Sequence, residues 1–305
     1  MSRIHEALRK AEQERASSAA VGRKDELPAI NTDALSSSPV APRNGKLFAP
    51  TTGIRDVMAP PSFEVLASRC VHLNWRLDPQ VSLVDGGESE TGGAERFRTL
   101  RSRLFQIAAT RPLRRVLITS SLPAEGKSFI AANLAQSLAC RQDSRVLLID
   151  GDLRAPRLHL ALCAPKSPGL TNCVRGETDE FSVIQIGAQS NLAFLPSGDA
   201  VADPDELILG GRVKKLLDFV TPAFDWVILD SPPALAVHDP SLFADLCDGV
   251  LFVVKAGETS YENAVKGSSE FREKNLLGVV LNQIQEADMY AGDYYYGKTY
   301  GRTRK

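Results

Sequence analysis

The segment 120–128, which reads SSLPAEGKS, constrains the fold more than any other stretch of the chain. It follows the apolar run 116–119 and precedes an Ala- and Leu-rich run. The order strand, tight loop and helix is typical of a phosphate-binding loop, because the N–H groups of the loop and of the helix start converge on one anion. Gly126 allows close approach of the backbone, Lys127 can reach the β and γ phosphates, and Ser128 can ligate Mg²⁺. An ordinary helix start is the alternative interpretation of this stretch alone.

Three positions of the segment depart from common nucleotide-binding patterns. Ser121 stands where the general pattern G-x-x-x-x-G-K-[ST] has its first glycine, and Phe129 stands where a second small hydroxyl residue is common. Leu122 occupies the place at which the ATPases that position chromosomes and septa carry a signature lysine. The sequence therefore disfavours a dimerisation-activated ATPase of that kind.

Short apolar runs alternate with helix-length segments through most of the chain. This pattern predicts an α/β fold of the P-loop NTPase type, with a mostly parallel sheet covered by helices on both faces. We also expect an edge strand at 81–84 and a helix at 94–109, after Gly92 and Gly93. The six main strands are predicted at 116–119, 146–149, 192–195, 226–229, 250–254 and 277–281.

Acidic residues follow two of these strands directly. Asp150, Asp152 and Arg154 come after the run 146–149, and Asp230 ends the run that begins at Trp226. In parallel sheets ligands bind beyond the carboxyl ends of the strands. Mg²⁺ prefers a few carboxylates together with water and phosphate oxygens. The sequence thus predicts that Asp152 and Asp230 complete a metal site with the loop serine; either acid alone is equally well explained as a solvated loop residue.

The composition of the chain indicates its compartment and its domain organisation and argues against nucleic-acid binding and a membrane span. A formal net charge of -1 argues against general nucleic-acid binding. The five cysteines are scattered, which favours a reducing cytoplasm, and no apolar run is long enough to cross a bilayer. We predict an amphipathic helix at 1–16, a flexible linker at 17–61, an ordered domain at 62–286 and a disordered tail at 287–305.

From about Val81 to its C-terminus the chain resembles the bacterial tyrosine kinases (BY-kinases) of capsular and exopolysaccharide systems. The resemblance rests on the loop 120–128, on Asp150-x-Asp152-x-Arg154-x-Pro156 and on Asp230-Ser231-Pro232-Pro233, with support from GVVLN at 278–282. The N-terminal residues 2–11 are similar to those of kinases encoded with exosortase-linked polysaccharide systems.

Two further features separate a kinase from a plain ATPase. Glu95, Arg98 and Arg101 are spaced by three residues and share a helix face, where they are either a surface ion pair or, as the resemblance implies, an oligomer contact. Tyrosines crowd the last sixteen residues, which are either a sticky terminus or, as the resemblance implies, the autophosphorylation sites. These tyrosines are Tyr290, Tyr294, Tyr295, Tyr296 and Tyr300.

The resemblance implies an ATP- and Mg²⁺-dependent protein-tyrosine autokinase that regulates polysaccharide polymerisation and export and phosphorylates its own tail in trans. The catalytic residues would be Lys127, Asp150, Asp152 and Asp230, and either Asp150 or Asp152 could accept the tyrosyl proton. The metal ligands would be Ser128, Asp152 and Asp230. The residues expected to contact the nucleotide are Pro123, Ala124, Glu125, Gly126, Lys127, Ser128, Phe129 and Arg154.

The resemblance also implies partners. These are a membrane-embedded chain-length-determinant protein (a polysaccharide co-polymerase) as activator, further copies of the chain and a cognate tyrosine phosphatase. The kinase would be cytoplasmic and peripheral at the inner face of the plasma membrane. Two alternatives remain: a P-loop ATPase whose tail only binds partners, and a nucleotide-dependent scaffold of an export complex.

Overall fold

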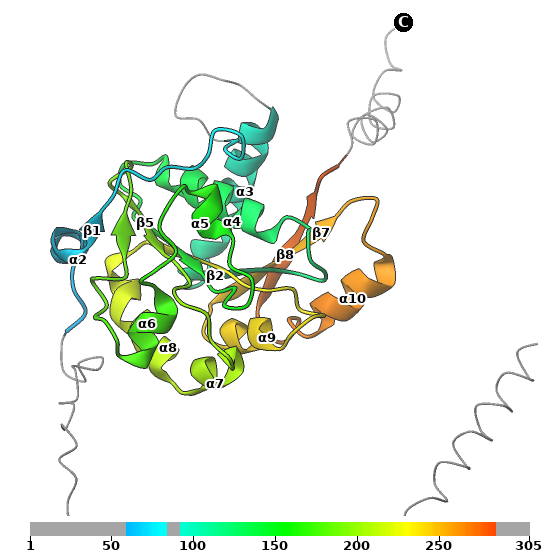
Figure 1. Ribbon diagram of the computed structural model, residues 1–305. Helices are drawn as coiled ribbons and strands as arrows, with labels where there is room; N and C mark the ends of the chain where they lie inside the picture. Colours follow the sequence, from blue (N-terminus) through cyan, green and yellow to red (C-terminus); the bar gives the residue numbers. More distant parts are fainter. Residues whose placement is uncertain (1–58, 84–91, 285–305) are drawn as a thin grey trace, which may run out of the picture. The chain divides into compact units, whose positions relative to one another are not determined.

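The computed structural model describes residues 59–83 and 92–284, which form an eight-stranded sheet with helices on both faces (Figure 1). The predicted helix at 1–16, nearly all of the predicted linker and the predicted tail at 287–305 lie outside the described residues. Within the described ranges, no helix combines the length and the apolar character that a membrane span requires.

The elements follow one another along the chain as an alternation of strands and helices. The strands are β1 (Val71–His72), β2 (Arg115–Ser120), β3 (Val146–Asp150), β4 (Gln185–Ile186), β5 (Leu192–Leu195), β6 (Trp226–Asp230), β7 (Gly249–Lys255) and β8 (Leu276–Asn282). The helices are α2 (Phe63–Arg69), α3 (Gly92–Ala108), α4 (Lys127–Ala139), α5 (Leu158–Ala161), α6 (Leu170–Arg175), α7 (Pro204–Leu209), α8 (Arg212–Val220), the 3-10 turn η1 (Thr221–Ala223), α9 (Asp239–Ala244) and α10 (Tyr261–Ser269).

The sheet brings the predicted acidic strand ends together. Its strand order is β1-β4-β5-β3-β6-β2-β7-β8, and every neighbouring pair is parallel except β4 and β5. The register of β3 and β6 sets Asp150 opposite Asp230. Because β2 lies on the other side of β6, the loop that follows β2 opens at the same edge as these two aspartates. The predicted α/β fold with a mostly parallel sheet is confirmed.

The hydrophobic core is divided between the two faces of the sheet. Successive residues of a strand point to opposite faces, so Leu117 and Leu147 enter one buried cluster while Val116 and Leu148 enter the other. Helices α3, α4 and α5 cover the second cluster, and α2 and α6 to α9 cover the first. The central strands are buried on both faces, which explains their continuous apolar sequences.

The edge strand that we predicted at 81–84 is wrong for its described residues. Residues 81–83 form a turn, in which the N–H groups of Val81 and Ser82 donate to the carbonyl of Asp78. The side chain of Asn133 on α4 then takes the place of a neighbouring strand: its Oδ1 accepts from the Leu83 N–H at 2.7 Å, and its Nδ2 donates to the Val81 carbonyl at 3.1 Å. The apolar residues of this segment therefore pack on α4.

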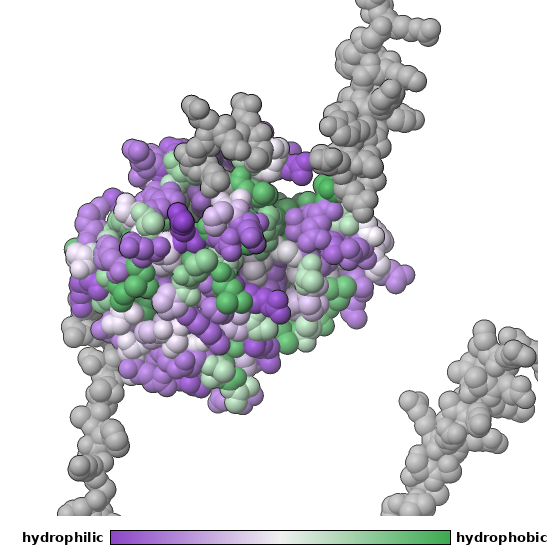
Figure 2. Space-filling model, turned by 45° about the horizontal axis from the view of Figure 1, so that its top comes forward, coloured by the Kyte–Doolittle hydropathy of each residue, from purple (hydrophilic) through white to green (hydrophobic). Residues whose placement is uncertain are grey.

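The edges of the sheet are the elements that the sequence predicts least well. One edge is β1, a strand of two residues that pairs with β4, and both are too short to show an alternating pattern. The other edge is β8, whose side chains Val279 and Leu281 are 54% and 58% exposed. Hydrophobic side chains are visible as green patches among hydrophilic ones on the face drawn in Figure 2.

The cysteines provide a test of this fold. Burial raises the pKa of the thiols of Cys70, Cys173 and the partly buried Cys247 to about 12; Cys140 and Cys163 are exposed, although partial burial raises the pKa of Cys140 as well. Since the thiolate is the reactive form, we expect two thiols to react rapidly with a chromogenic disulfide in the folded protein and the other three only after denaturation. Absorbance stopped-flow measures both phases. A rapid phase that survives the double change of Cys140 and Cys163 to Ser would contradict the packing described here.

Candidate active site

The loop between β2 and α4 adopts a strained backbone at two positions. Ala124 has a φ of 65° and Gly126 a φ of 92°, both in the left-handed region. A Cβ at residue 126 would collide with Nδ2 of Asn282, so the site requires glycine for its space as well as for its φ. Gly126 is also the N-cap of α4 and provides no capping side chain. The first N–H groups of α4 are therefore left for an anionic ligand.

Residues from distant strands hold this loop in place. The carboxylate of Glu125 is buried; it accepts a hydrogen bond from the Leu122 N–H at 2.6 Å and another from the hydroxyl of Thr259, which follows β7. The side-chain amide of Asn282, at the end of β8, donates to the Glu125 carbonyl at 2.9 Å. The Glu125 side chain thus stabilises the loop from the side that faces away from the cavity, and it does not line the cavity.

The serine at the position of the usual first glycine has a packing role. Ser121 is fully buried, and its hydroxyl donates to the carbonyl of Asn263 on α10 at 3.1 Å. A Cβ added to Gly267 of the same helix would lie 3.0 Å from that hydroxyl. The loop and α10 therefore approach each other closely, and Ser121 fills and bonds this contact.

Four predicted residues meet at the carboxyl edge of the sheet. Lys127 Nζ lies 3.2 Å from Asp152 Oδ2 and 3.3 Å from Ser128 Oγ. The Ser128 hydroxyl donates to Asp230 Oδ2 at 2.5 Å. The structure thus brings together the lysine, the serine and two of the aspartates that we selected from the sequence.

The electrostatics of the cluster are dominated by burial. Asp230 is completely buried, which raises its pKa to about 6, although the Lys127 ammonium and the Ser128 hydroxyl oppose the shift. Burial alone would lower the pKa of Lys127, but the surrounding aspartates outweigh it and the pKa is raised. The lysine therefore carries a positive charge near the buried carboxylates of Asp150 and Asp230, which are costly to ionise.

The residues present fit a Mg²⁺ ion. Oδ1 of Asp230 is buried and has no hydrogen-bond partner, so one carboxylate oxygen is left for a cation. In the described part of the chain no group of three or more His, Cys, Asp or Glu side chains forms a metal site by itself. This matches Mg²⁺, which proteins hold through one or two carboxylates together with water and substrate phosphates. Ser128, Asp152 and Asp230 are the residues that would hold it.

Asp150 has a structural environment that differs from that of the other two acids. Its carboxylate is buried and accepts from the N–H groups of Asp152 at 3.3 Å and Leu158 at 3.2 Å. Burial and the neighbouring carboxylates raise its pKa well above the usual value. Asp150 does not line the cavity. Its hydrogen bonds with two backbone N–H groups instead hold the conformation of the segment that carries Asp152.

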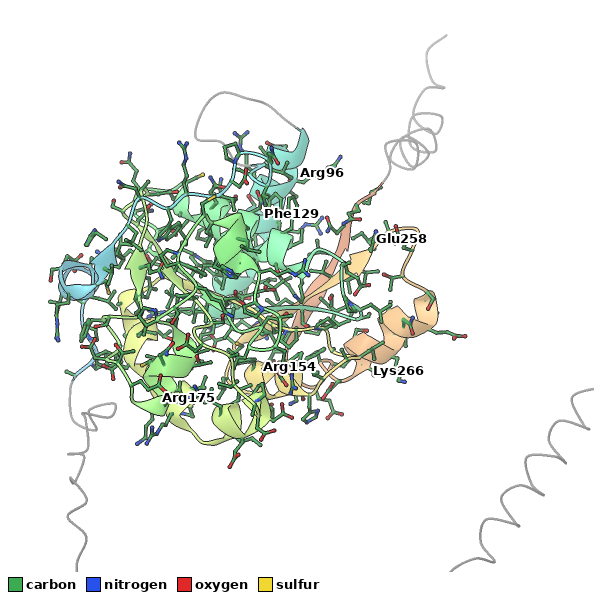
Figure 3. All side chains as sticks on the ribbon, viewed as in Figure 1. Arg96, Phe129, Arg154, Arg175, Glu258 and Lys266 are labelled. Atoms are coloured by element: carbon green, nitrogen blue, oxygen red, sulfur yellow. The ribbon has the colours of Figure 1, made fainter. Side chains whose placement is uncertain are left out.

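A cavity of about 390 Å³ lies over the loop, within the usual range for ligand pockets of about 300–1,000 Å³. Seven of the eight residues that we expected to contact nucleotide line it, all except Glu125. Phe129 lies on the side of α3 and Arg154 on the side of α9 (Figure 3). The lining also includes the predicted metal ligand Asp152 and, from the second motif, Pro232 and Pro233. The sequence did not indicate Ala155, Arg157, Ala236 and Val237 as lining residues.

The guanidinium of Arg154 is already engaged within the chain. It donates to both carboxylate oxygens of Asp239, with the shortest contact 2.9 Å, and to Asp205 at 2.6 Å. Asp239 is buried at the start of α9, and the following Pro240 lies in the first turn, where its missing N–H costs no helical hydrogen bond. Asp239 and Pro240 thus start a helix that anchors Arg154.

The predicted oligomer-contact residues lie on α3. Glu95 and Arg98 form an exposed ion pair of 3.1 Å, while Arg101 donates to the carbonyl of Ser137 on α4 at 2.6 Å. Arg101 therefore has a function inside the subunit, and the oligomer contact remains a prediction. The five predicted autophosphorylation tyrosines lie outside the described residues.

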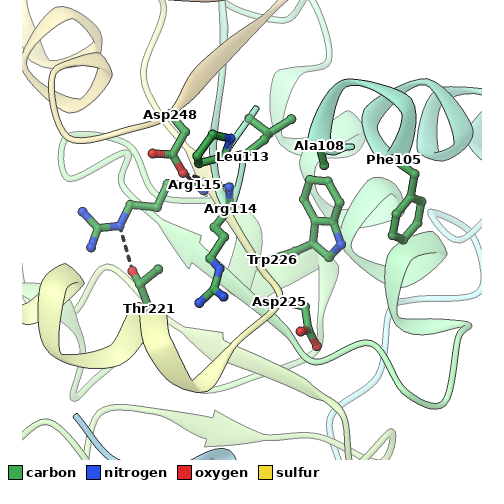
Figure 4. Close-up of a pocket in the computed structure, with 10 residues that line it drawn as sticks. Phe105, Ala108, Leu113, Arg114, Arg115, Thr221, Asp225, Trp226 and Asp248 are labelled. Atoms are coloured by element: carbon green, nitrogen blue, oxygen red, sulfur yellow. Dashed lines mark hydrogen bonds between the residues drawn. The ribbon is translucent and has the colours of Figure 1, made fainter. Parts of the chain in front are cut away.

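At the amino ends of the strands, away from the candidate active site, the charged side chains of Arg115 and Asp248 are bonded within the protein. A hollow of about 630 Å³ lies at the amino ends of β2 and β6 (Figure 4). There Arg115 donates to Thr221 and Asp218, and Asp248 accepts from the backbone N–H groups of Arg114 and Arg115. These contacts are closed within the protein, whereas the carboxyl edge leaves Asp230 Oδ1 without a partner.

No model of a known protein family matches the chain. Curated relatives do. The chain is 35% identical over 197 residues to the tyrosine-protein kinase YwqD of Bacillus subtilis (strain 168), covering 64% of this chain and 83% of that protein. It is 30% identical over 208 residues to the putative tyrosine-protein kinase CapB of Staphylococcus aureus, covering 67% and 90%. It is 34% identical to the succinoglycan biosynthesis transport protein ExoP of Rhizobium meliloti (strain 1021), of which it covers only 28%.

The chain is also similar in fold to solved structures. The chimerical protein CapA2B2 superposes with a TM-score of 0.64 at 28% identity, covering 74% of this chain and 96% of that one. The kinase domain of the Escherichia coli tyrosine kinase ETK gives a TM-score of 0.61 at 27% identity, covering 64% and 76%.

The loop glycine supports a graded stability test. We expect Gly126→Ala to lower the free energy of unfolding most, because the new Cβ meets Asn282 in addition to the strain of a positive φ, which costs about 1–3 kcal/mol. Gly257→Ala, with a φ of 73° and open space, isolates the strain, and Gly278→Ala has neither penalty. Urea denaturation measures the series. Equal losses for Gly126→Ala and Gly257→Ala would refute the role given to Asn282.

The ion pair of Arg154 gives a second test. Arg154→Gln should cost about 1–3 kcal/mol of unfolding free energy, because it removes charge-assisted hydrogen bonds from a buried carboxylate. Combining it with Asp239→Asn should cost less than the sum of the two single changes. Asp143→Asn, which removes an exposed pair with Arg141 and leaves the arginine over the Phe105 ring, serves as the control and should leave the free energy of unfolding nearly unchanged. Strict additivity would argue that Arg154 is free to serve another ligand.

Proposed function

The chain belongs to the bacterial tyrosine kinases, and from this we propose that it transfers the γ-phosphoryl group of ATP, with Mg²⁺, to tyrosines 290–300 of another copy of itself. YwqD is named a tyrosine-protein kinase and CapB a putative one, while ExoP is named a succinoglycan biosynthesis transport protein. The donor, the metal, the acceptor segment and transfer in trans are our proposal.

The observation that carries the proposal is the arrangement of Lys127, Ser128, Asp152 and Asp230 beneath an open cavity at the start of α4. Phosphoryl transfer asks a protein mainly for positioning and for neutralisation of charge. Lys127 keeps its positive charge because aspartates surround it, and it can move from Asp152 to a phosphate oxygen. The open N–H groups of α4 orient the same phosphates.

When bound, Mg²⁺ would neutralise charge on the phosphate oxygens. The chain prepares for it by holding Ser128 against one oxygen of Asp230 and leaving the other oxygen without a partner. Asp152 lines the cavity, and its Oδ1 accepts from the Ala155 N–H at 2.9 Å, which fixes the orientation of the carboxylate. These contacts support Ser128, Asp152 and Asp230 as the ligands.

In the proposed reaction the acceptor phenol oxygen bonds to the γ-phosphorus while the bond from that phosphorus to the β–γ bridging oxygen breaks, and ADP leaves. The phenol has a reference pKa of about 10, so its proton must be accepted. Asp152 reaches the cavity, whereas Asp150 is committed to two backbone N–H groups. We therefore assign the proton to Asp152 and a positioning role to Asp150.

The proposed setting is a polysaccharide export system. We propose a membrane-embedded chain-length-determinant protein as activator, a cognate phosphatase that resets the tail, and a location at the inner face of the membrane reached through that partner. The predicted contact helix carries an exposed Glu95–Arg98 pair, which supports α3 as the surface between copies. Deleting residues 1–58 would test whether the N-terminal segment provides the tether.

Complementation between two inactive chains tests transfer in trans. A Lys127→Ala chain retains the tyrosines but should lose at least about 100-fold in rate, since a positioned cation is removed from the transferred group. A second chain with all five tail tyrosines changed to Phe retains the site but has no acceptor. With Mg²⁺ and ATP, we expect phosphotyrosine only in the mixture and only on the Lys127→Ala chain, as read by mass spectrometry.

Matched variants complete the experiment. Lys214→Ala removes an exposed lysine of α8 and should phosphorylate normally. EDTA should abolish the signal, and excess Mg²⁺ should restore it. ATP hydrolysis without phosphotyrosine would instead favour an ATPase, and the absence of both signals, even with a partner, would favour a scaffold.

A further inference from the structure

A groove runs beside the candidate active site, between α3 and the edge strand β8, and we call it the α3–β8 groove. It encloses about 260 Å³, which is below the usual size of small-molecule pockets. Its volume and apolar character suit side chains from a peptide better than a metabolite. The groove is lined by Leu83, Gly93, Arg96, Phe97, Thr99, Leu100, Arg103, Phe129, Ile130 and residues 279–284.

The groove is connected to the candidate active site by two residues. Phe129 lines both the groove and the cavity over the phosphate-binding loop, and its ring packs edge-to-face against Phe97 at 6.3 Å between centroids. Asn282 lines the groove and also donates to the Glu125 carbonyl of the loop. Whatever fills the groove therefore contacts two residues, Phe129 and Asn282, that adjoin or bond to the loop.

The exposed side of the groove is both apolar and basic. Val279 and Leu281 of β8 are more than half exposed, and β8 has a strand neighbour only on the side of β7 among the described residues. Arg103 of α3 is exposed and forms no ion pair or hydrogen bond with the described part of the chain. A matching ligand would present apolar side chains and at least one carboxylate.

We propose that residues 285–290 of the same chain dock in the α3–β8 groove. The chain leaves the described residues at Ile284, which is itself part of the groove, so the local concentration of the next residues is high. Gln283 has a φ of 57°, which turns the backbone directly after β8. The sequence QEADMY then supplies two acids to match Arg103 and two large side chains, Met289 and Tyr290, for the apolar floor.

This docking would couple the start of the tail to the phosphate-binding loop. A docked segment restrains Asn282 and Phe129 and thereby the loop residues that they contact. It would also hold Tyr290 away from a neighbouring active site while leaving Tyr294–Tyr300 accessible. That second consequence rests on the proposed transfer in trans, whereas the docking itself requires neither nucleotide nor catalysis.

Hydrogen–deuterium exchange of the full-length chain without nucleotide tests the docking independently of kinase activity. Reversing the tail charges (Glu286→Lys with Asp288→Lys) or the groove charge (Arg103→Glu) should speed exchange of amides 279–284 about two- to fivefold, as expected for losing an exposed ion pair. Combining the reversals should restore slow exchange. Changing Met289 and Tyr290 together to Ser should speed exchange about tenfold or more. The loop amides 122–128 should follow the same order.

Controls separate the docking from general effects. Asp293→Lys, which reverses an acid beyond the docked segment, should leave exchange unchanged, and the buried amides of β2 and β6 should stay protected in every variant that folds. The same results are expected in the Lys127→Ala background, so that loss of kinase activity is distinguishable from loss of docking. Exchange that is identical in all variants would overturn the proposal. Protection that depends on protein concentration would assign the groove to a second copy, and protection lost on removing residues 1–58 would assign it to the N-terminal segment.

Discussion

The burial of Asp230 is the constraint from which the rest of the site follows. A carboxylate with no access to water is costly to ionise, and its raised pKa expresses that cost. The backbone N–H of Ser231 favours the charged form, and the neighbouring ammonium of Lys127 and the hydroxyl of Ser128 favour it more strongly. Both belong to the first turn of α4, so the helix must begin at a fixed place above the sheet. The buried carboxylate oxygen of Asp230 that has no hydrogen-bond partner is also the oxygen left for a metal ion.

Fixing the start of α4 requires residues from the far end of the chain. The Asn282 side chain lies so close to Gly126 that no Cβ fits there, and Glu125 is held by Thr259. Thr259 follows β7 and Asn282 ends β8, both more than a hundred residues after the loop. The phosphate-binding loop is therefore completed by contacts from β8 and from the segment after β7.

Sequence patterns were sufficient for the elements that repeat and for the residues that end them. Six apolar runs became six strands, with ends that differ by at most one residue from the prediction, and Lys127, Ser128, Asp152 and Asp230 converge because parallel strands end at one edge. The patterns failed where side chains replace backbone partners. The segment at 81–83 looks like a strand but bonds to Asn133, and the engagement of Arg154 by Asp239 depends on how α9 packs. No local spacing encodes such contacts.

Phe129 illustrates how a departure from a motif can carry information. Beside Ser128, the proposed metal ligand, a small hydroxyl residue would contact only the cavity over the loop, whereas an aromatic ring is large enough to line two cavities at once. The ring rests on Phe97 of α3, the same helix that carries the exposed Glu95–Arg98 pair and the solvent-facing Arg103. The single side chain of Phe129 therefore separates contacts made on α3, by the tail or by another copy, from the cavity over the phosphate-binding loop. In the proposed reaction the acceptor and the catalyst are parts of the same chain, and in the proposed docking the occupancy of the groove would report on the tail before any phosphate is transferred.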